Sequence, residues 1–204
     1  MFSTIGKGRG SVANGITRIS ALQGIGHPTT SETNPGIVLR ERYPATMLNL
    51  RGPADQAFLG HAQSALGCEL PLSSNSSRAT SDGEILRLAP NEWLLVAGAT
   101  SRWSEAISIE GATLTDISHG RVIILVSGDK VLDALAKGCP VDLHPDQFPP
   151  GMCVQTSIAK ISVILHRGQS GDEYALYVPR SYAGSFWHWL TESAREYGYH
   201  FVRR

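Results

Sequence analysis

The chain has 204 residues, with 18 basic and 18 acidic side chains and a formal net charge of zero. Such a balance provides no long-range field for an oppositely charged partner, so a nucleic-acid-binding module is not expected. The three cysteines lie far apart in the sequence, which argues against a disulfide framework and favours a reducing compartment, the cytoplasm. No stretch approaches the roughly 18 apolar residues of a membrane span, so no membrane partner is expected.

Residues 1–37 are predicted to form an extended N-terminal arm. They are rich in Gly, Ser and Thr, and Phe2 is their only aromatic, too little to build a core. We expect this arm either to stay mobile or to lie along a partner. Residues 38–204 are predicted to form one domain of two subdomains, at about 38–112 and 113–204.

The first subdomain begins with a predicted strand at Ala45–Leu50. Gly52-Pro53 punctuates the chain, and Pro53 suits the first turn of a helix that runs to about Leu66 and ends at Gly67. A polar loop is expected at Ser73–Gly83. Further along, the pattern predicts strands at Ile85–Leu88 and Trp93–Ala97, a turn at Pro90-Asn91, and a short helix around 102–107.

The second subdomain repeats this plan. Val122–Val126 is a β-branched strand, Gly128-Asp129 starts a helix, and Lys137-Gly138 ends it. Both helices are followed by Gly-Cys, and Glu92–Val96 is echoed by Glu173–Tyr177. The repeated order indicates an internal duplication and an α+β fold, duplicated β-α-β subdomains rather than a doubly wound sheet; chance similarity remains the alternative.

The last helix carries an unusually wide apolar arc. Ala183, Phe186 and Leu190 cluster on one side, while Trp187 and Trp189 lie near opposite edges of the arc. We favour the interpretation that both tryptophans cover the sheet, because such rings are usually buried. The alternative is that Trp187 remains partly exposed and anchors another protein.

Motifs for chemistry are weak. No nucleophile elbow, dinucleotide-binding loop or Walker pattern occurs in a strand-to-helix context. Asp142, His144 and Asp146 come closest to a metal site, but a solvated Pro-rich loop explains them better. The segment Asp116–Arg121 holds an acid, a hydroxyl, an imidazole and a guanidinium, and could supply acid–base groups. We favour a structural turn there, so no catalytic, cofactor-binding or metal-binding residue is assigned.

A partner interface is the site class that the sequence favours. Arg40-Glu41-Arg42 is either a solvated edge or a docking point. His119 or Arg121 could point at a partner from the turn. The predicted interface residues are Arg40, Arg42, His119, Arg121 and Trp187.

Taken together, several segments resemble the gamma subunit of heterotetrameric sarcosine oxidase. The resemblance extends over roughly residues 37–198. The segments that carry it are Val38–Arg42, Pro90–Leu95, Asp116–Arg121, Val126–Gly128, Lys137–Pro145, Phe148–Gly151 and Tyr177–Tyr182.

The resemblance implies a fold like the folate-binding domain of the glycine cleavage aminomethyltransferase, with two interlocked subdomains. It implies partners, namely larger alpha and beta flavoprotein subunits and a small delta subunit. FAD, FMN, NAD and tetrahydrofolate are expected on those partners, and none on this chain alone. Such a complex demethylates sarcosine to glycine and forms methylene-tetrahydrofolate and hydrogen peroxide.

Two departures from the wider group bear on catalysis. Where the aminomethyltransferases carry an aspartate toward folate, Lys160–Leu165 offers no carboxylate. After Lys137-Gly138-Cys139, Pro140-Val141-Asp142 replaces the aromatic and Gly-Gln-Glu run of iron–sulfur assembly relatives. The resemblance therefore implies a non-catalytic gamma subunit. The alternatives are a small subunit of an N-methylglutamate dehydrogenase and, disfavoured by the missing carboxylate, a free-standing folate-dependent aminomethyltransferase.

Overall fold

The computed structural model describes residues 19–25, 29, 33–43, 45–98, 101, 103 and 108–202. Most of the predicted arm, and most of the short helix expected around 102–107, therefore lie outside the described residues.

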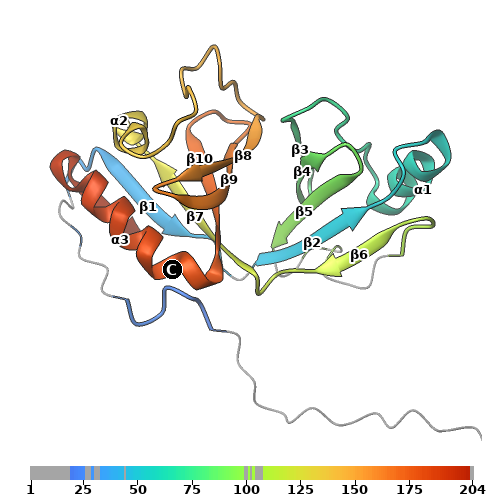
Figure 1. The fold of residues 1–204 in the computed structure, drawn as a ribbon, viewed down its shortest axis with the longest axis horizontal. Coiled ribbons are helices and arrows are strands. Elements are labelled where there is room, and N and C mark those ends of the chain that lie inside the picture. Colours follow the sequence, from blue (N-terminus) through green and yellow to red (C-terminus); the bar gives the residue numbers. More distant parts are fainter. Residues whose placement is uncertain are drawn as a thin grey trace, which may run out of the picture.

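The described residues form two β-sheets and three α-helices (Figure 1). The five-stranded sheet has the order β3-β4-β5-β2-β6, built from β2 (Ala45–Arg51), β3 (Ser77–Ala79), β4 (Gly83–Ala89), β5 (Glu92–Gly98) and β6 (Thr113–Asp116). The six-stranded sheet has the order β11-β1-β7-β10-β9-β8, built from β1 (Ile37–Glu41), β7 (Arg121–Ser127), β8 (Cys153–Ile158), β9 (Ile161–Arg167), β10 (Glu173–Pro179) and β11 (Tyr199–Val202). The helices are α1 (Gln56–Leu66), α2 (Val131–Ala136) and α3 (Ala183–Ala194), with single 3-10 turns η2 (Arg180–Tyr182) and η3 (Arg195–Tyr197).

The two sheets face each other, and helices cover their outer faces. One apolar cluster joins α1 to the five-stranded sheet, through Phe58 and Trp93 among others. A second joins α2 and α3 to the six-stranded sheet, through Leu135 and Phe186 among others. A third lies between the sheets. The predicted α+β class is confirmed, and no helix in the described part of the chain is long and apolar enough to cross a membrane.

The two halves repeat one order of elements, as the sequence predicted. The first half runs β2-α1-β3-β4-β5, and the second runs β7-α2-β8-β9-β10. In each half the last strand pairs antiparallel with the strand that precedes the helix, so β5 lies beside β2 and β10 lies beside β7. The echoed segments Glu92–Val96 and Glu173–Tyr177 thus occupy matching places in the two sheets.

The halves also exchange one strand each. β1 leads directly into β2, yet it pairs with β7 in the other sheet; β6 leads into β7, yet it pairs with β2. The sheets therefore do not divide at the boundary expected at 112, because residues 113–116 complete the first sheet and β1 extends the second. Each exchanged strand covers a strand edge that would otherwise be open, and the exchange interlocks the halves.

Helix α1 begins later than predicted. Asp55 is its N-cap, with its carboxylate accepting a hydrogen bond from the Phe58 amide at 2.9 Å, so Pro53 lies before the helix. The predicted end is confirmed, since Gly67 takes the left-handed conformation with φ 74°. The loop expected at Ser73–Gly83 contains strand β3, which pairs with β4.

One described part of the arm packs on the fold itself. Leu22 is 1% exposed and belongs to the core cluster under α3. The Ser20 hydroxyl lies 2.6 Å from both oxygens of Glu41, at the end of β1. Residues 19–25 therefore pack on the chain itself, because an apolar side chain there completes the chain's own core.

Candidate functional site

Four polar side chains meet in the interior between the two sheets. Arg42 reaches from the end of β1 to Glu84 on β4, with nitrogen–oxygen distances of 3.1 and 3.4 Å. The Tyr177 hydroxyl, on β10, donates to the same carboxylate at 3.4 Å. His166 on β9 places Nδ1 3.6 Å from a Glu84 oxygen. One carboxylate thus links strands of both sheets.

His166 occupies the most constrained position of this cluster. Its side chain is buried, and Nε2 lies 2.8 Å from the Ser77 hydroxyl, which donates to the Gly151 carbonyl at 2.7 Å. Because that hydroxyl proton is already used, Nε2 is the protonated nitrogen and Nδ1 is left without a hydrogen bond. Burial lowers the pKa of His166 and outweighs the opposing effect of the Glu84 charge, so the imidazole is neutral.

The remaining groups of the cluster hold fixed protonation states. Burial alone would raise the pKa of Glu84, but the charge of Arg42 and the hydrogen bonds from Arg42 and Tyr177 lower it below its usual value. Burial raises the pKa of Tyr177 far above its usual value. The interior therefore contains an ionised Arg42–Glu84 pair and neutral Tyr177 and His166 side chains.

The sequence analysis missed Glu84, His166 and Tyr177 as a group. His166 and Ile164 share one face of β9, and that face packs between the sheets. A histidine on the same face of the strand as an apolar residue was therefore the feature of the sequence that indicated a buried polar group. Which residues face it across the gap depends on how the sheets stack, which a strand pattern does not reveal.

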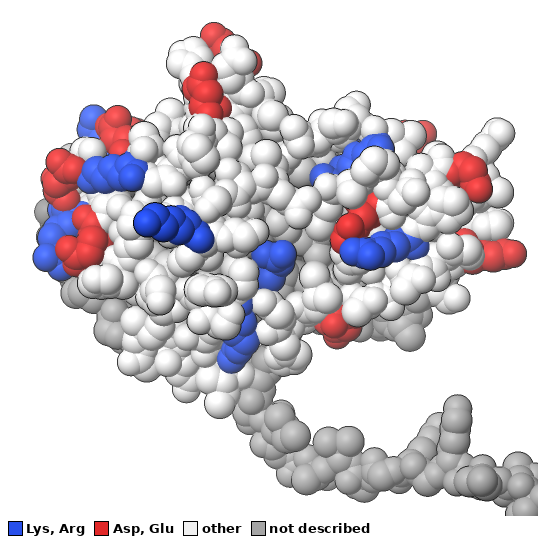
Figure 2. All heavy atoms as spheres, viewed as in Figure 1, with Lys and Arg blue, Asp and Glu red and all other residues white. Residues whose placement is uncertain are grey.

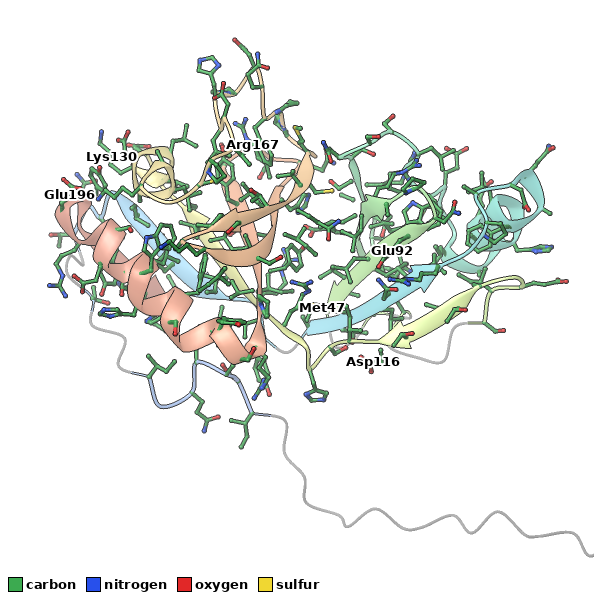
Figure 3. All side chains as sticks on the ribbon, in the orientation of Figure 1. Met47, Glu92, Asp116, Lys130, Arg167 and Glu196 are labelled. Atoms are coloured by element: carbon green, nitrogen blue, oxygen red, sulfur yellow. The ribbon has the colours of Figure 1, made fainter. Side chains whose placement is uncertain are left out.

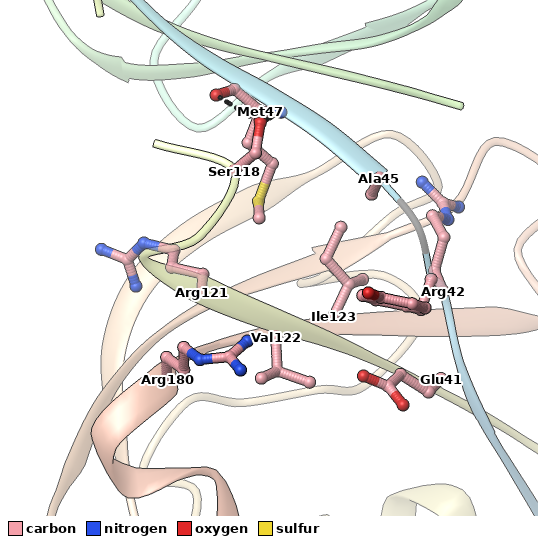
Figure 4. Close-up of a pocket in the computed structure, with 10 residues that line it drawn as sticks. Glu41, Arg42, Ala45, Met47, Ser118, Arg121, Val122, Ile123 and Arg180 are labelled. Carbon is pink, nitrogen blue, oxygen red and sulfur yellow. Dashed lines mark hydrogen bonds between the residues drawn. The ribbon is translucent and has the colours of Figure 1, made fainter. Parts of the chain in front are cut away.

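A second polar site lies where the chain crosses between the halves (Figure 4). Met47 and Asp116 lie close to this crossing in Figure 3. The Ser118 hydroxyl accepts a hydrogen bond from the Met47 amide at 2.9 Å, and the Ser118 amide donates to Asp116 at 2.8 Å. These bonds make Asp116–Arg121 the structural turn that the sequence analysis favoured.

A small pocket opens beside this turn. Its cavity volume of about 10 Å³ has room for roughly one water molecule. The lining residues come from both crossing segments and from η2: Glu41, Arg42, Tyr43, Ala45, Met47, Ser118, Arg121, Val122, Ile123 and Arg180.

The predicted interface residues do not all come together. Arg42 and Arg121 line the same pocket, but Arg42 is directed to Glu84 in the interior. Arg40 is on the surface, 2.9 Å from Glu173, and His119 is exposed in the turn. The guanidinium of the half-buried Arg121 donates to the Tyr177 carbonyl at 3.2 Å, and burial lowers its pKa.

Trp187 is not exposed. Its side chain is 2% accessible, and its ring meets Phe201 edge-on with centroids 5.1 Å apart. The alternative of a partly exposed ring is wrong, because the chain turns at η3 and returns as β11, which brings Phe201 over the tryptophan. The favoured interpretation, that the aromatic arc covers the sheet, is correct for this residue.

The other sequence candidates show no assembled site. Among the described residues, no three His, Cys, Asp or Glu side chains are grouped so that they could hold a metal ion. The Asp142 carboxylate accepts from the His144 amide, and both are exposed. Burial raises the pKa of Cys139 and raises that of Cys153 to about 12, so neither thiol is activated.

Comparison with known proteins identifies related sequences. The model of the sarcosine oxidase, gamma subunit family matches residues 51–196. A sarcosine oxidase subunit gamma from Arthrobacter sp. is 31% identical over 173 residues, which covers 81% of this chain and 83% of the relative. The protein of the same name from Corynebacterium sp. (strain U-96) is 31% identical over 169 residues, covering 79% and 80%.

Solved structures of related proteins also match this chain. A chain of the heterotetrameric sarcosine oxidase from Corynebacterium sp. U-96, in complex with pyrrole 2-carboxylate, matches with a TM-score of 0.72 and 27% identity. The match covers 82% of this chain and 88% of that one. The glycine cleavage system aminomethyltransferase T from Bartonella henselae shares the fold, with a TM-score of 0.59, 17% identity, and coverage of 83% of this chain and 48% of that chain.

Proposed function

Because the chain belongs to the sarcosine oxidase gamma subunit family, we propose that it is a non-catalytic subunit of a cytoplasmic heterotetrameric sarcosine oxidase. The complex would convert sarcosine, tetrahydrofolate and oxygen into glycine, methylene-tetrahydrofolate and hydrogen peroxide. The observation that carries the proposal is the match along most of both chains to a protein of a solved heterotetramer.

The partners in this proposal are the alpha, beta and delta subunits. FAD, FMN, NAD and tetrahydrofolate are assigned to those partners, and none to this chain. Two features of the described residues support that division. The charged groups between the sheets bond one another. In addition, Lys160–Leu165, at the start of β9, offers no carboxylate.

The role we propose for the chain is that of a rigid body with fixed surface groups. The exchanged strands β1 and β6 and the Arg42–Glu84 pair prevent the halves from moving independently. Of the predicted interface residues, Arg40, His119 and Arg121 keep polar atoms near the surface and remain candidates for partner contact. Arg42 and Trp187 are assigned instead to internal support.

Co-expression with the larger subunits tests the proposed function. We expect this chain to co-purify with them and the complex to form hydrogen peroxide in the presence of sarcosine. The matched control is the same set of subunits without this chain. A chain that stays monomeric beside correctly folded partners contradicts the proposal. Peroxide formation from N-methylglutamate instead of sarcosine would identify N-methylglutamate as the substrate of the complex.

A variant of His166 tests the non-catalytic part. His166 carries a buried ring nitrogen that lacks a hydrogen bond and lies 3.6 Å from a Glu84 oxygen, so it is the strongest candidate for proton transfer in the described interior. We expect assembled complexes with His166→Gln to keep kcat and KM for sarcosine within about twofold, even where the chain is less stable. A loss of tenfold or more in kcat per assembled complex would make this chain catalytic.

A further inference from the structure

Two arginines lie side by side at the crossing between the halves. Arg121 starts β7 and pairs with Pro179, the last residue of β10, so Arg180 directly follows the neighbouring strand. The Arg180 amide donates to the Gly120 carbonyl at 2.9 Å, which ties the two backbones together. Both side chains line the pocket at the crossing (Figure 4).

Among the described residues, few acceptors bind the hydrogen-bond donors of these two guanidinium groups. Arg121 donates to the Tyr177 carbonyl at 3.2 Å, and Arg180 donates to the Ile19 carbonyl at 2.8 Å. Each guanidinium has five N–H donors, and neither of these two forms an ion pair within the described part of the chain. Glu41, the carboxylate that lines the pocket, is bonded to Ser20.

Arg121 and Arg180 differ in this respect from the arginines that form ion pairs. Each of these has its own carboxylate: Arg40 with Glu173, Arg42 with Glu84, Arg51 with Glu92, Arg78 with Glu69 and Arg195 with Glu192. In Figure 2 basic side chains occupy the surface at the junction of the halves, and the nearest acidic side chains in view lie apart from them. Within the described residues no carboxylate forms an ion pair with Arg121 or Arg180, and an external carboxylate would supply that partner.

Exposed apolar groups border the two arginines. Ile19, whose carbonyl binds Arg180, is 52% exposed, and Tyr182, two residues after Arg180, is 53% exposed. Tyrosine and arginine are the residue types enriched in the cores of protein interfaces. The surface of Arg121, Arg180, Ile19 and Tyr182, here called the crossing patch, therefore has the composition of a docking site.

The nature of the occupant follows from charge and volume. A cavity of about 10 Å³ cannot enclose a metabolite. A carboxylate that binds the two arginines must therefore belong to a molecule that lies on the surface. Residues 1–31 of this chain contain no Asp or Glu, so the first part of its own arm cannot supply a carboxylate. A chain with zero net charge and two unpaired arginines does not suit nucleic acid.

We propose that the crossing patch binds an acidic segment of another subunit of the complex, with carboxylates between Arg121 and Arg180 and apolar side chains on Ile19 and Tyr182. This inference rests on the proposed function and adds the chemistry of the contact. A bidentate carboxylate would engage the free edges of the guanidinium groups and fix the orientation of this chain on its partner.

Binding of the full chain to larger subunits purified without it tests this inference. The measurement is the dissociation constant, at low and at high salt, for wild type, Arg180→Gln and Arg121→Gln/Arg180→Gln. We expect the double variant to bind about thirtyfold more weakly or worse, and its affinity to depend less on salt. Arg51→Gln is the matched control, because Arg51 is an exposed arginine at the end of β2 and is paired with Glu92.

The outcomes separate this inference from the proposed function. A double variant that keeps its thermal midpoint and binds within threefold of wild type overturns the crossing patch while the complex still forms. The crossing patch is also overturned if Arg51→Gln weakens binding to the larger subunits equally, or if the double variant changes only the self-association of this chain. Wild type that does not bind the larger subunits contradicts the proposed function itself. Arg180→Gln alone leaves the Arg121–Tyr177 bond intact, so weaker binding by this variant at an unchanged thermal midpoint supports the crossing patch.

Discussion

Arg42 and Glu84 join the two sheets through the interior: the guanidinium of one lies 3.1 Å from the carboxylate of the other, and both side chains are mostly buried. Arg42 follows β1 of the six-stranded sheet, and Glu84 is part of β4 of the five-stranded sheet. Because burying either charge alone is costly, the pair strongly favours the one stacking of the sheets that lets both charges meet.

Removing one charge of this pair will destabilise the chain. We expect Glu84→Gln to lower the free energy of unfolding by about 2–4 kcal/mol, since Arg42 is left buried without a counter-charge. Chemical denaturation measures the change. Glu173→Gln is the matched control, because its partner Arg40 is 52% exposed and such a pair contributes under about 1 kcal/mol. Equal losses in the two variants would contradict the assignment.

Stability should fall when the solution becomes mildly acidic. Burial lowers the pKa of His166 in the folded chain, so below about pH 6.5 the unfolded state binds the proton more readily. The free energy of unfolding should therefore decrease as pH falls from about 6.5 through the folded pKa. Urea unfolding between pH 7.5 and 5 should show a smaller decrease for His166→Gln; parallel curves would sink this prediction.

Trp187 should matter for folding rather than for assembly. We expect Trp187→Ala to cost about 3–5 kcal/mol of stability, because it empties the space beneath Phe201. His188→Ala, at the next and exposed position, should cost little. Thermal unfolding of both variants gives the comparison. A Trp187→Ala chain of normal stability that binds its partners poorly would return this residue to the interface.

Two glycines should respond to alanine in opposite directions. Gly128 has φ 115°, and a Cβ there would lie 2.4 Å from the Gly36 carbonyl oxygen, so Gly128→Ala should destabilise the chain by more than about 1 kcal/mol. Gly60 in α1 has open space, and Gly60→Ala should stabilise by about 0.5–1 kcal/mol. Denaturation midpoints test both, and changes of equal sign would be unexpected.

The cysteines should differ in reactivity. Burial raises the pKa of Cys153 to about 12, whereas Cys68 is partly exposed. Because the thiolate is the reactive form, iodoacetamide at pH 8 should modify Cys68 first and Cys153 only after unfolding. Mass spectrometry of the peptides at intervals measures the order. Rapid labelling of Cys153 in the folded chain would contradict the buried position.

Local patterns were sufficient for most of the elements. The apolar runs at Ile85–Leu88, Trp93–Ala97 and Val122–Val126 lie within strands β4, β5 and β7, and Gly67 ends α1 as expected. Strand alternation and glycine stops depend on neighbouring residues, so sequence alone suffices for them. The repeated order of elements was visible for the same reason.

The chain's own sequence determined its neutral charge, its α+β class and its two related halves. Only the tertiary structure decided which strand completes which sheet, because the pairing of β1 with β7 joins residues more than 80 positions apart. It also decided that Arg42 faces Glu84, that Phe201 covers Trp187, and that Arg121 and Arg180 lie side by side. Such contacts depend on how sheets stack and where the chain returns, which residue type and spacing do not encode locally.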